Sequence, residues 1–182
     1  FSVNVADSNR LMPMYGKSLD EIYHDPFSET PLKERECETA YPSHPDAAIG
    51  RGGHGLFSTA SDYLEFALMT KSGRSREGEP LVSRKVLEFA WHNRLQPHLM
   101  PIAVGPFPQP GYGWNLLGRV MTDLGQAIHP TGMDEGVWAG AAATYYWVDR
   151  NEDLVGVIMT QNLGTLSPMR NDMQTATYQA VT

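Results

Sequence analysis

The chain is poor in cysteine, in long apolar runs and in positive charge. Cys37 is its single cysteine, which excludes an internal disulfide framework and a cysteine-rich metal site. No window approaches the roughly 18 continuous apolar residues of a membrane span. Fourteen basic residues against 21 acidic ones give a net charge of -7. This balance argues against nucleic acid and against anionic membranes as partners.

Several familiar catalytic and metal-binding motifs are also missing. There is no Gly-x-Ser-x-Gly elbow, no Walker loop and no His-Glu-x-x-His pair. The histidines lack the spacing of metal ligands, so the sequence indicates neither a metal nor a cofactor; they stand at positions 24, 44, 54, 92, 98 and 129. The first residue is Phe and no signal peptide follows. We therefore expect that processing or truncation removed an upstream segment, and the compartment stays open between cytoplasm and periplasm.

The composition that remains is that of a soluble globular protein. The 182 residues are 41% hydrophobic and 19% charged, enough for one domain or a large piece of a bigger one. Residues 1–50 are punctuated by prolines and predict an irregular excursion with one short strand. Glycines at 50–55 then predict a hinge.

The later segments predict helices, then antiparallel strands, then a closing helix. Ser58 or Thr59 is expected to cap a helix that ends near Gly73, and Ser83 to start a second one that ends near Asn93. Five prolines within 96–110 predict a loop without regular structure. The predicted strands are 112–121 with a hairpin return to 127–129, then 142–149 and 154–160 around an acidic turn at 150–153. The last fifteen residues suit a helix. The pattern predicts an α+β fold, an antiparallel sheet flanked by helices.

The stretch 137–149 places the smallest side chains of the chain beside some of its bulkiest. Trp138 is followed by Ala139, Gly140 and Ala141, and then by a dense aromatic and β-branched run. Small residues let another group approach the backbone closely, and a strand edge exposes amide hydrogens. The stretch is thus either a site that holds a negatively charged oxygen or a tightly packed strand.

Three blocks of sequence stand in an order that a known family shares. The first is Gly52-Gly-His-Gly-Leu-Phe-Ser-Thr-Ala-Ser-Asp-Tyr-Leu-Glu-Phe66, followed by Pro80-Leu-Val-Ser-Arg-Lys-Val-Leu87. Next comes the strand start Gly111-Tyr-Gly113. The last is Trp138-Ala-Gly140, which runs into Thr144-Tyr-Tyr-Trp-Val-Asp149 and Asp153-Leu-Val-Gly-Val-Ile-Met-Thr-Gln161. Together they resemble the serine β-lactamase-like family, in particular the carboxylesterases and class C-like enzymes of the penicillin-binding fold.

The resemblance implies an enzyme with three active-site motifs. These are a Ser-x-x-Lys, a Tyr-x-Asn or Tyr-x-Ser, and a Lys-Thr-Gly or its analogue on a strand, where a backbone amide donates to the oxyanion. Trp138-Ala139-Gly140 occupies the third place, and the backbone N–H of Ala141 matches the oxyanion donor. Tyr112 is expected either to line the same cleft or to pack the fold. The expected substrate-binding residues are Trp138, Ala139, Gly140 and Tyr112.

The first two motifs of the family have no convincing counterpart. No serine is followed three positions later by lysine, and the one Tyr-x-Ser, Tyr41-Pro-Ser43, lies in a proline-rich loop. The chain therefore resembles the C-terminal half of such an enzyme. In that reading, residues 1–50 are the end of the family's helical region and 51–182 the C-terminal part of its α/β region. Acyl transfer needs an activated nucleophile, so we expect the chain to be inactive without an N-terminal portion, as a separate or clipped chain.

Trp138 is also informative about the substrate. β-Lactamases begin the third motif with a lysine, which attracts the substrate's carboxylate, whereas Trp138 is uncharged and broad. A neutral ester suits it better than an anionic lactam, so the sequence favours a carboxylesterase or acyltransferase. The alternatives are a β-lactamase or D-amino-peptidase that takes an amide, and a non-catalytic binding module of the same fold in which Trp138 only packs the strand.

Overall fold

The computed structural model describes residues 3–17, 21, 24–25, 33–35, 53, 55–105, 107–164 and 168–182. Cys37 and the Tyr41-Pro-Ser43 motif lie outside the described residues. The chain divides into two compact units, of which the first is Phe1–Thr59, Ala141–Thr144 and Met159–Leu166. The second is Ala60–Gly140, Tyr145–Ile158 and Ser167–Thr182. The assignment of residues 1–50 to the end of the family's helical region, and of 51–182 to the C-terminal part of its α/β region, stays a prediction.

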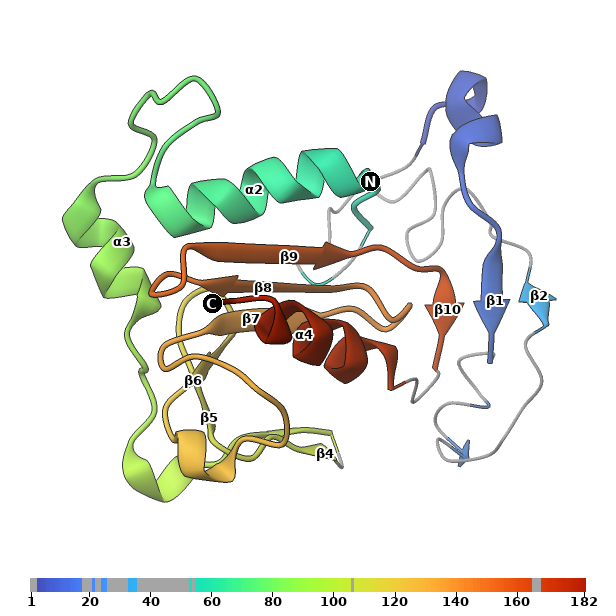
Figure 1. The fold of residues 1–182 in the computed structure, drawn as a ribbon. Coiled ribbons are helices and arrows are strands. Elements are labelled where there is room, and N and C mark those ends of the chain that lie inside the picture. Colours follow the sequence, from blue (N-terminus) through green and yellow to red (C-terminus); the bar gives the residue numbers. More distant parts are fainter. Residues whose placement is uncertain are drawn as a thin grey trace. The chain divides into compact units, whose positions relative to one another are not determined.

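The second unit is built on a five-stranded antiparallel sheet whose strands follow one another in chain order (Figure 1). The strands are β5 Tyr112–Trp114, β6 Arg119–Met121, β7 Gly136–Ala139, β8 Tyr145–Asp149 and β9 Leu154–Ile158. In the centre, Val137 pairs with Trp147 and Trp138 with Tyr146. Each strand is antiparallel to the next one along the chain, so the sheet needs no crossover.

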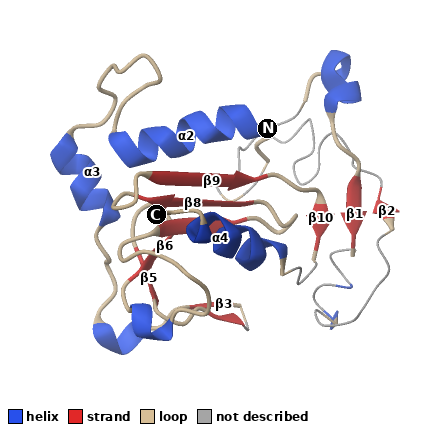
Figure 2. Cartoon of the chain, viewed as in Figure 1, coloured by secondary structure: helices blue, strands red, loops and turns tan. Residues whose placement is uncertain are grey.

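Both faces of this sheet are covered, which explains why every residue of β8 is buried. Tyr145 and Trp147 enter one hydrophobic cluster, which includes Tyr178 of helix α4 (Met169–Gln179). Tyr146 and Val148 point the other way, into a cluster with residues of α2 (Ala60–Ser72) and α3 (Arg84–Trp91). Figure 2 shows these helices packed around the strands. The α+β fold with an antiparallel sheet and flanking helices is confirmed.

The predicted single strand over 112–121 is wrong. The chain reverses after Trp114, so β5 and β6 form a hairpin. The Asn115 Oδ1 atom accepts hydrogen bonds from the amides of Leu117 at 2.7 Å and Gly118 at 2.9 Å, which holds the turn. Gly118 has φ 150°, a conformation that favours glycine. The expected hairpin partner 127–129 is not a strand either, and β6 pairs with β7 instead.

The other predictions for this unit hold with small shifts. The helices α2, α3 and α4 and the hairpin β8–β9 are confirmed, and Ser83 caps α3 by accepting from the Val86 amide at 3.3 Å. The strand predicted over 142–149 begins only at Tyr145. The proline-rich loop is more regular than expected, with 3-10 helix η2 (Pro97–Leu99) and the two-residue pair β3 (Ala103–Val104) and β4 (Phe107–Pro108). A further 3-10 helix, η3, covers Leu124–Gln126.

The first unit has a three-stranded sheet in the order β10-β1-β2. Its strands are β1 Met14–Gly16, β2 Glu34–Arg35 and β10 Asn162–Leu163, and 3-10 helix η1 covers Val5–Arg10. β1 runs parallel to β10 and antiparallel to β2, so this segment contains two short strands where one was expected. None of the described helices is long and apolar enough to cross a bilayer.

Candidate active site

The residues predicted to hold substrate lie at the end of β7. Trp138 and Ala139 are its last two residues, half-buried and paired with Tyr146 and Tyr145 of β8. Gly140 follows directly, and Ala141 opens the loop 141–144 that leads to β8. The strand thus delivers its backbone to an exposed connection, where Ala141 is solvent-accessible.

The carbonyl groups of this loop are held by residues within β10 (Asn162–Leu163) and on either side of it. The carbonyl oxygen of Ala142 accepts from the Asn162 amide at 3.1 Å and from the Thr160 hydroxyl at 2.6 Å. That of Ala141 accepts from the Gly164 amide at 3.2 Å. In contrast, the N–H of Ala141 donates no backbone hydrogen bond to any part of the chain that the structure describes. The loop is therefore tied down through its acceptors while this donor points to no backbone partner.

Ala143 shows that the loop is shaped by tertiary contacts. Its φ of 61° lies in the left-handed region, which costs an alanine roughly 1–2 kcal/mol. The residue is nonetheless buried, with 4% of its surface exposed. A local cost of this size persists only where surrounding contacts over-determine the backbone.

Trp138 sits in an aromatic and cationic surrounding. The ring of Trp114 from β5 meets it edge-on, with centroids 4.7 Å apart and planes at 84°. The guanidinium carbon of Arg119 lies 5.9 Å from the Trp138 ring centroid and 5.1 Å from that of Tyr112. The structure therefore brings Trp138 and Tyr112 to the same arginine. Sequence reasoning missed Arg119, because nothing in the sequence places it beside the tryptophan.

Arg119 is itself held only in part. One of its terminal nitrogens donates to the side-chain oxygen of Gln109. Its Nε atom is buried and has no hydrogen-bond partner among the described residues. A cation beside Trp138 was not expected from the sequence, which contributes only an uncharged residue at the third-motif position.

Tyr112 is buried, and its hydroxyl is already engaged. Only 5% of its surface is exposed, and the hydroxyl donates to Glu135 Oε1 at 3.2 Å. Burial raises the pKa of Tyr112, with the neighbouring Glu135 charge as the next cause, so the phenol stays neutral. These contacts favour the packing role that the sequence left open, and substrate contact by Tyr112 stays a prediction.

Glu135 is the centre of a buried polar network on the α4 face of the sheet. Its carboxylate accepts from the hydroxyls of Tyr112 and Tyr178 and from the side-chain amide of Gln174. Burial raises the pKa of Glu135 to about 7, although these hydrogen bonds act in the opposite direction. Glu135 was not singled out from the sequence, because no local signal in the sequence points to its burial.

Asp149 is the last residue of β8, and its side chain also shapes the turn that follows. Its Oδ1 atom accepts from the amides of Asn151 at 2.9 Å and Glu152 at 3.0 Å, which closes the β8–β9 turn. Its Oδ2 atom also accepts from the Tyr178 hydroxyl at 2.7 Å. The side chain is fully buried and so cannot meet a substrate.

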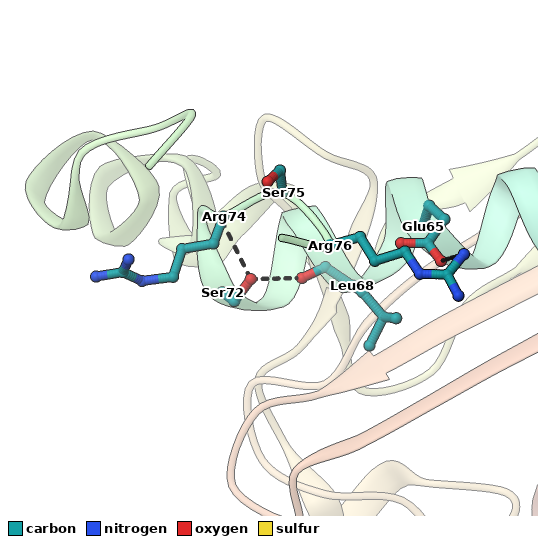
Figure 3. Close-up of a pocket in the computed structure, with 6 residues that line it drawn as sticks. All are labelled: Glu65, Leu68, Ser72, Arg74, Ser75 and Arg76. Carbon is teal, nitrogen blue, oxygen red and sulfur yellow. Dashed lines mark hydrogen bonds and ion pairs between the residues drawn. The ribbon is translucent and has the colours of Figure 1, made fainter. Parts of the chain in front are cut away.

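A separate polar pocket of about 300 Å³ lies around the C-terminal end of α2 (Figure 3). Its side chains engage one another and the backbone: Ser72 donates to the Leu68 carbonyl at 2.9 Å, and Arg76 pairs with Glu65 at 3.6 Å. Neither contact gives a serine a base. We therefore assign no reaction to this pocket.

A metal site is a separate question. In the described ranges, His, Cys, Asp and Glu side chains form no group of three that could hold a metal ion.

Comparison with known proteins places the chain in a family. A family model described as Beta-lactamase matches residues 6–179. No curated protein sequence matches the chain.

Solved structures show the same fold. EstCE1, a hydrolase with promiscuous acyltransferase activity, is 18% identical with a TM-score of 0.70, over 98% of this chain and 45% of that one. A mutant of simvastatin synthase (LovD) from Aspergillus terreus is 16% identical with a TM-score of 0.68, over 94% of this chain and 43% of that one. The chain thus spans less than half the length of either structure.

Proposed function

This chain belongs to the Beta-lactamase family, and on that premise we propose that it forms the C-terminal half of a serine hydrolase that cleaves carboxylic esters through an acyl-enzyme. In this role it supplies the oxyanion strand and part of the substrate wall. The Ser-x-x-Lys and tyrosine motifs are contributed by an N-terminal portion, in the same or a separate chain.

The amide of Ala141 is the single observation that carries this proposal. Ala141 stands directly after Trp138-Ala139-Gly140, the segment that corresponds to the family's third motif. The residue is exposed, and its N–H donates to no backbone carbonyl of the described chain. An amide whose direction is set before the reaction stabilises the negative oxygen of a tetrahedral intermediate without reorganisation.

The lack of a nucleophile in the sequence supports a division of labour. Ester cleavage through an acyl-enzyme needs a hydroxyl with a base beside it. The sequence of 182 residues contains no Ser-x-x-Lys motif. In the polar pocket, the hydrogen bonds that Ser72 and Ser75 form within the described residues are to backbone groups and not to a base. The chain also covers less than half of the two solved structures, EstCE1 and the LovD mutant.

The surroundings of Trp138 support a neutral acyl or alcohol group in the substrate. Trp138 and Trp114 join their rings into one apolar surface at the strand end. The guanidinium group of Arg119 lies beside the Trp138 ring and donates one hydrogen bond to Gln109. An acyltransferase would use the same acyl-enzyme with an alcohol in place of water. EstCE1 is a hydrolase with promiscuous acyltransferase activity, and LovD is a simvastatin synthase.

An ester assay tests the proposal. A short-chain aryl ester is offered to this chain alone, to the protein with its N-terminal portion, and to the latter with Ala141→Pro. We expect no turnover by the chain alone and turnover by the protein with its N-terminal portion. In that protein Ala141→Pro should lower kcat about 10²–10³-fold, because proline has no amide hydrogen. Ala141→Gly keeps the amide and serves as the matched control, with activity near wild type.

Three results would overturn the proposal. Turnover by the isolated chain would show that a nucleophile lies within it. Full activity of Ala141→Pro would remove the oxyanion role. An N-terminal portion without a Ser-x-x-Lys motif and without ester turnover would favour the non-catalytic binding module instead.

A further inference from the structure

Arg170 touches the backbone at the proposed oxyanion position. It is the second residue of α4, and its Nη2 atom donates to the carbonyl oxygen of Gly140 at 2.9 Å. Its guanidinium carbon also lies 5.7 Å from the ring centroid of Tyr145. The side chain is half-buried, so the bond is partly shielded from water. A charged donor in such a place makes a stronger bond than a neutral one.

The place of Arg170 in its own helix is unfavourable. The first turn of a helix carries a partial positive charge and prefers acidic residues, so an arginine there costs a few tenths of a kcal/mol to about 1 kcal/mol. Helix formation therefore gives no reason for this residue. Its reason lies in what the guanidinium touches, which is Gly140 at the end of β7.

The Gly140 carbonyl and the Ala141 amide belong to one peptide group. That group is planar and trans, so the C=O and N–H bonds point in opposite directions. Holding the oxygen of Gly140 fixes the direction of the Ala141 hydrogen. A cation at the oxygen also draws electron density from the peptide, which makes its N–H a better donor.

We propose that Arg170 is a positioning residue for the reaction, which orients and polarises the Gly140–Ala141 peptide so that its N–H donates a hydrogen bond to the oxyanion. This inference rests on the proposed function above. Arg170 acts through the peptide and does not itself meet the substrate.

A specific kinetic signature follows. The oxyanion forms only as the transition state is approached, so an interaction that improves its donor lowers the barrier without improving substrate binding. Loss of the Arg170 guanidinium is expected to lower kcat about 10–100-fold, less than complete loss of an oxyanion donor, and to leave KM within about twofold.

The experiment uses the protein with its N-terminal portion and a short-chain aryl ester. Arg170→Ala removes the donor, and Arg170→Met removes it while keeping an apolar stem against Tyr145. Arg94→Ala is the matched control, because Arg94 also donates to a backbone carbonyl, that of Phe89, and lies 3.6 Å from the centroid of that residue's ring. Thermal unfolding is recorded for every variant.

We expect both Arg170 variants to lose kcat and the Arg94 variant to keep it. Millimolar guanidinium should restore part of the kcat of Arg170→Ala, whereas a purely structural loss would not respond. Wild-type kcat in either folded Arg170 variant would overturn the inference. So would a loss of activity that appears as a raised KM and does not respond to guanidinium.

The two proposals fail in different ways. If Ala141→Pro is inactive while Arg170→Met keeps wild-type kcat, the oxyanion assignment stands and the role of Arg170 falls. If the wild-type protein has no ester turnover, the proposed function falls and Arg170 loses its role with it.

Discussion

The hydroxyl of Tyr178 donates to the carboxylate of Glu135 across 2.8 Å, inside the protein. The same hydroxyl lies 2.7 Å from Asp149 Oδ2, so one phenol connects two buried carboxylates. Since the hydroxyl has one hydrogen, it serves only one of them at a time. A proton on the Glu135 carboxyl group supplies the second hydrogen that the two contacts need. Such a proton agrees with the pKa of Glu135, which burial raises to about 7.

Stability is expected to fall as the pH rises from about 4.5 to about 7. Glu135 has an ordinary pKa of 4.5 and a folded pKa of about 7, so between these values the folded state binds more protons than the unfolded state. The total loss is roughly 3 kcal/mol, complete above pH 7 and absent below 4.5. Tyr112 and Tyr145 also face this network, and burial raises the pKa of each, so both phenols stay neutral over this window.

Urea unfolding between pH 4.5 and 8 checks this prediction. Glu135→Gln keeps a hydrogen-bonding side chain of nearly the same shape but does not titrate, so this contribution to the fall should disappear. A fall of equal size in wild type and variant would mean that another group is responsible.

The glycine at the start of β7 is expected to tolerate no side chain. A Cβ on Gly136 would lie 2.0 Å from the ring of Trp91. That ring is 5% exposed, and its Nε1 donates to the Thr70 carbonyl at 2.8 Å, so it has little room to move. Gly136→Ala should lower the free energy of unfolding by about 1–3 kcal/mol, which outweighs the gain of under about 1 kcal/mol from a stiffer unfolded chain.

Thermal and urea unfolding measure the effect of Gly136→Ala. Gly53→Ala is the control, because a Cβ there meets nothing within 4 Å and the backbone has no positive φ. Equal stabilities of the two variants would show that Trp91 yields easily.

A lysine at position 138 is expected to change which substrates are preferred. Trp138→Lys replaces an apolar ring with the cation found at the first position of the third motif in β-lactamases. The ratio of kcat/KM for a neutral ester to that for its carboxylate-bearing analogue should fall about tenfold or more, which corresponds to about 1.4 kcal/mol.

The ratio is measured on the protein with its N-terminal portion. Trp114→Phe, which changes the neighbouring ring without adding charge, is the control and should keep the wild-type ratio. An unchanged ratio in Trp138→Lys would assign Trp138 to packing at the strand end, the reading in which it meets no substrate.

Elements defined by neighbouring residues could be predicted from the sequence. Ser83 precedes an amphipathic run and does cap α3 through the Val86 amide. Asp149 precedes four polar residues, 150–153, and its side chain closes the turn between β8 and β9. Caps, turns and periodicity act over a few positions, so each signal is complete within the segment that it shapes.

The split of 112–121 into two strands shows where such signals run out. Residues on both sides of the turn favour a strand, and the turn depends on one side chain, Asn115, folding back onto two amides. The choice of partner for β6 is not local at all. β6 pairs with β7, which begins fifteen residues after β6 ends, and not with the nearer residues 127–129.

The order of motifs along the chain indicated its family, and the pattern of predicted helices and strands indicated its α+β class. The segment Trp138-Ala139-Gly140 supplied a hypothesis for the residues of the oxyanion strand. Folding alone brought Arg170 to Gly140, Arg119 to Trp138, and Tyr178 to Glu135. These partners lie far apart in the sequence, and no periodicity or cap encodes such pairs. Burial then changes their chemistry, because a carboxyl group or a guanidinium takes its properties from the groups that surround it in space.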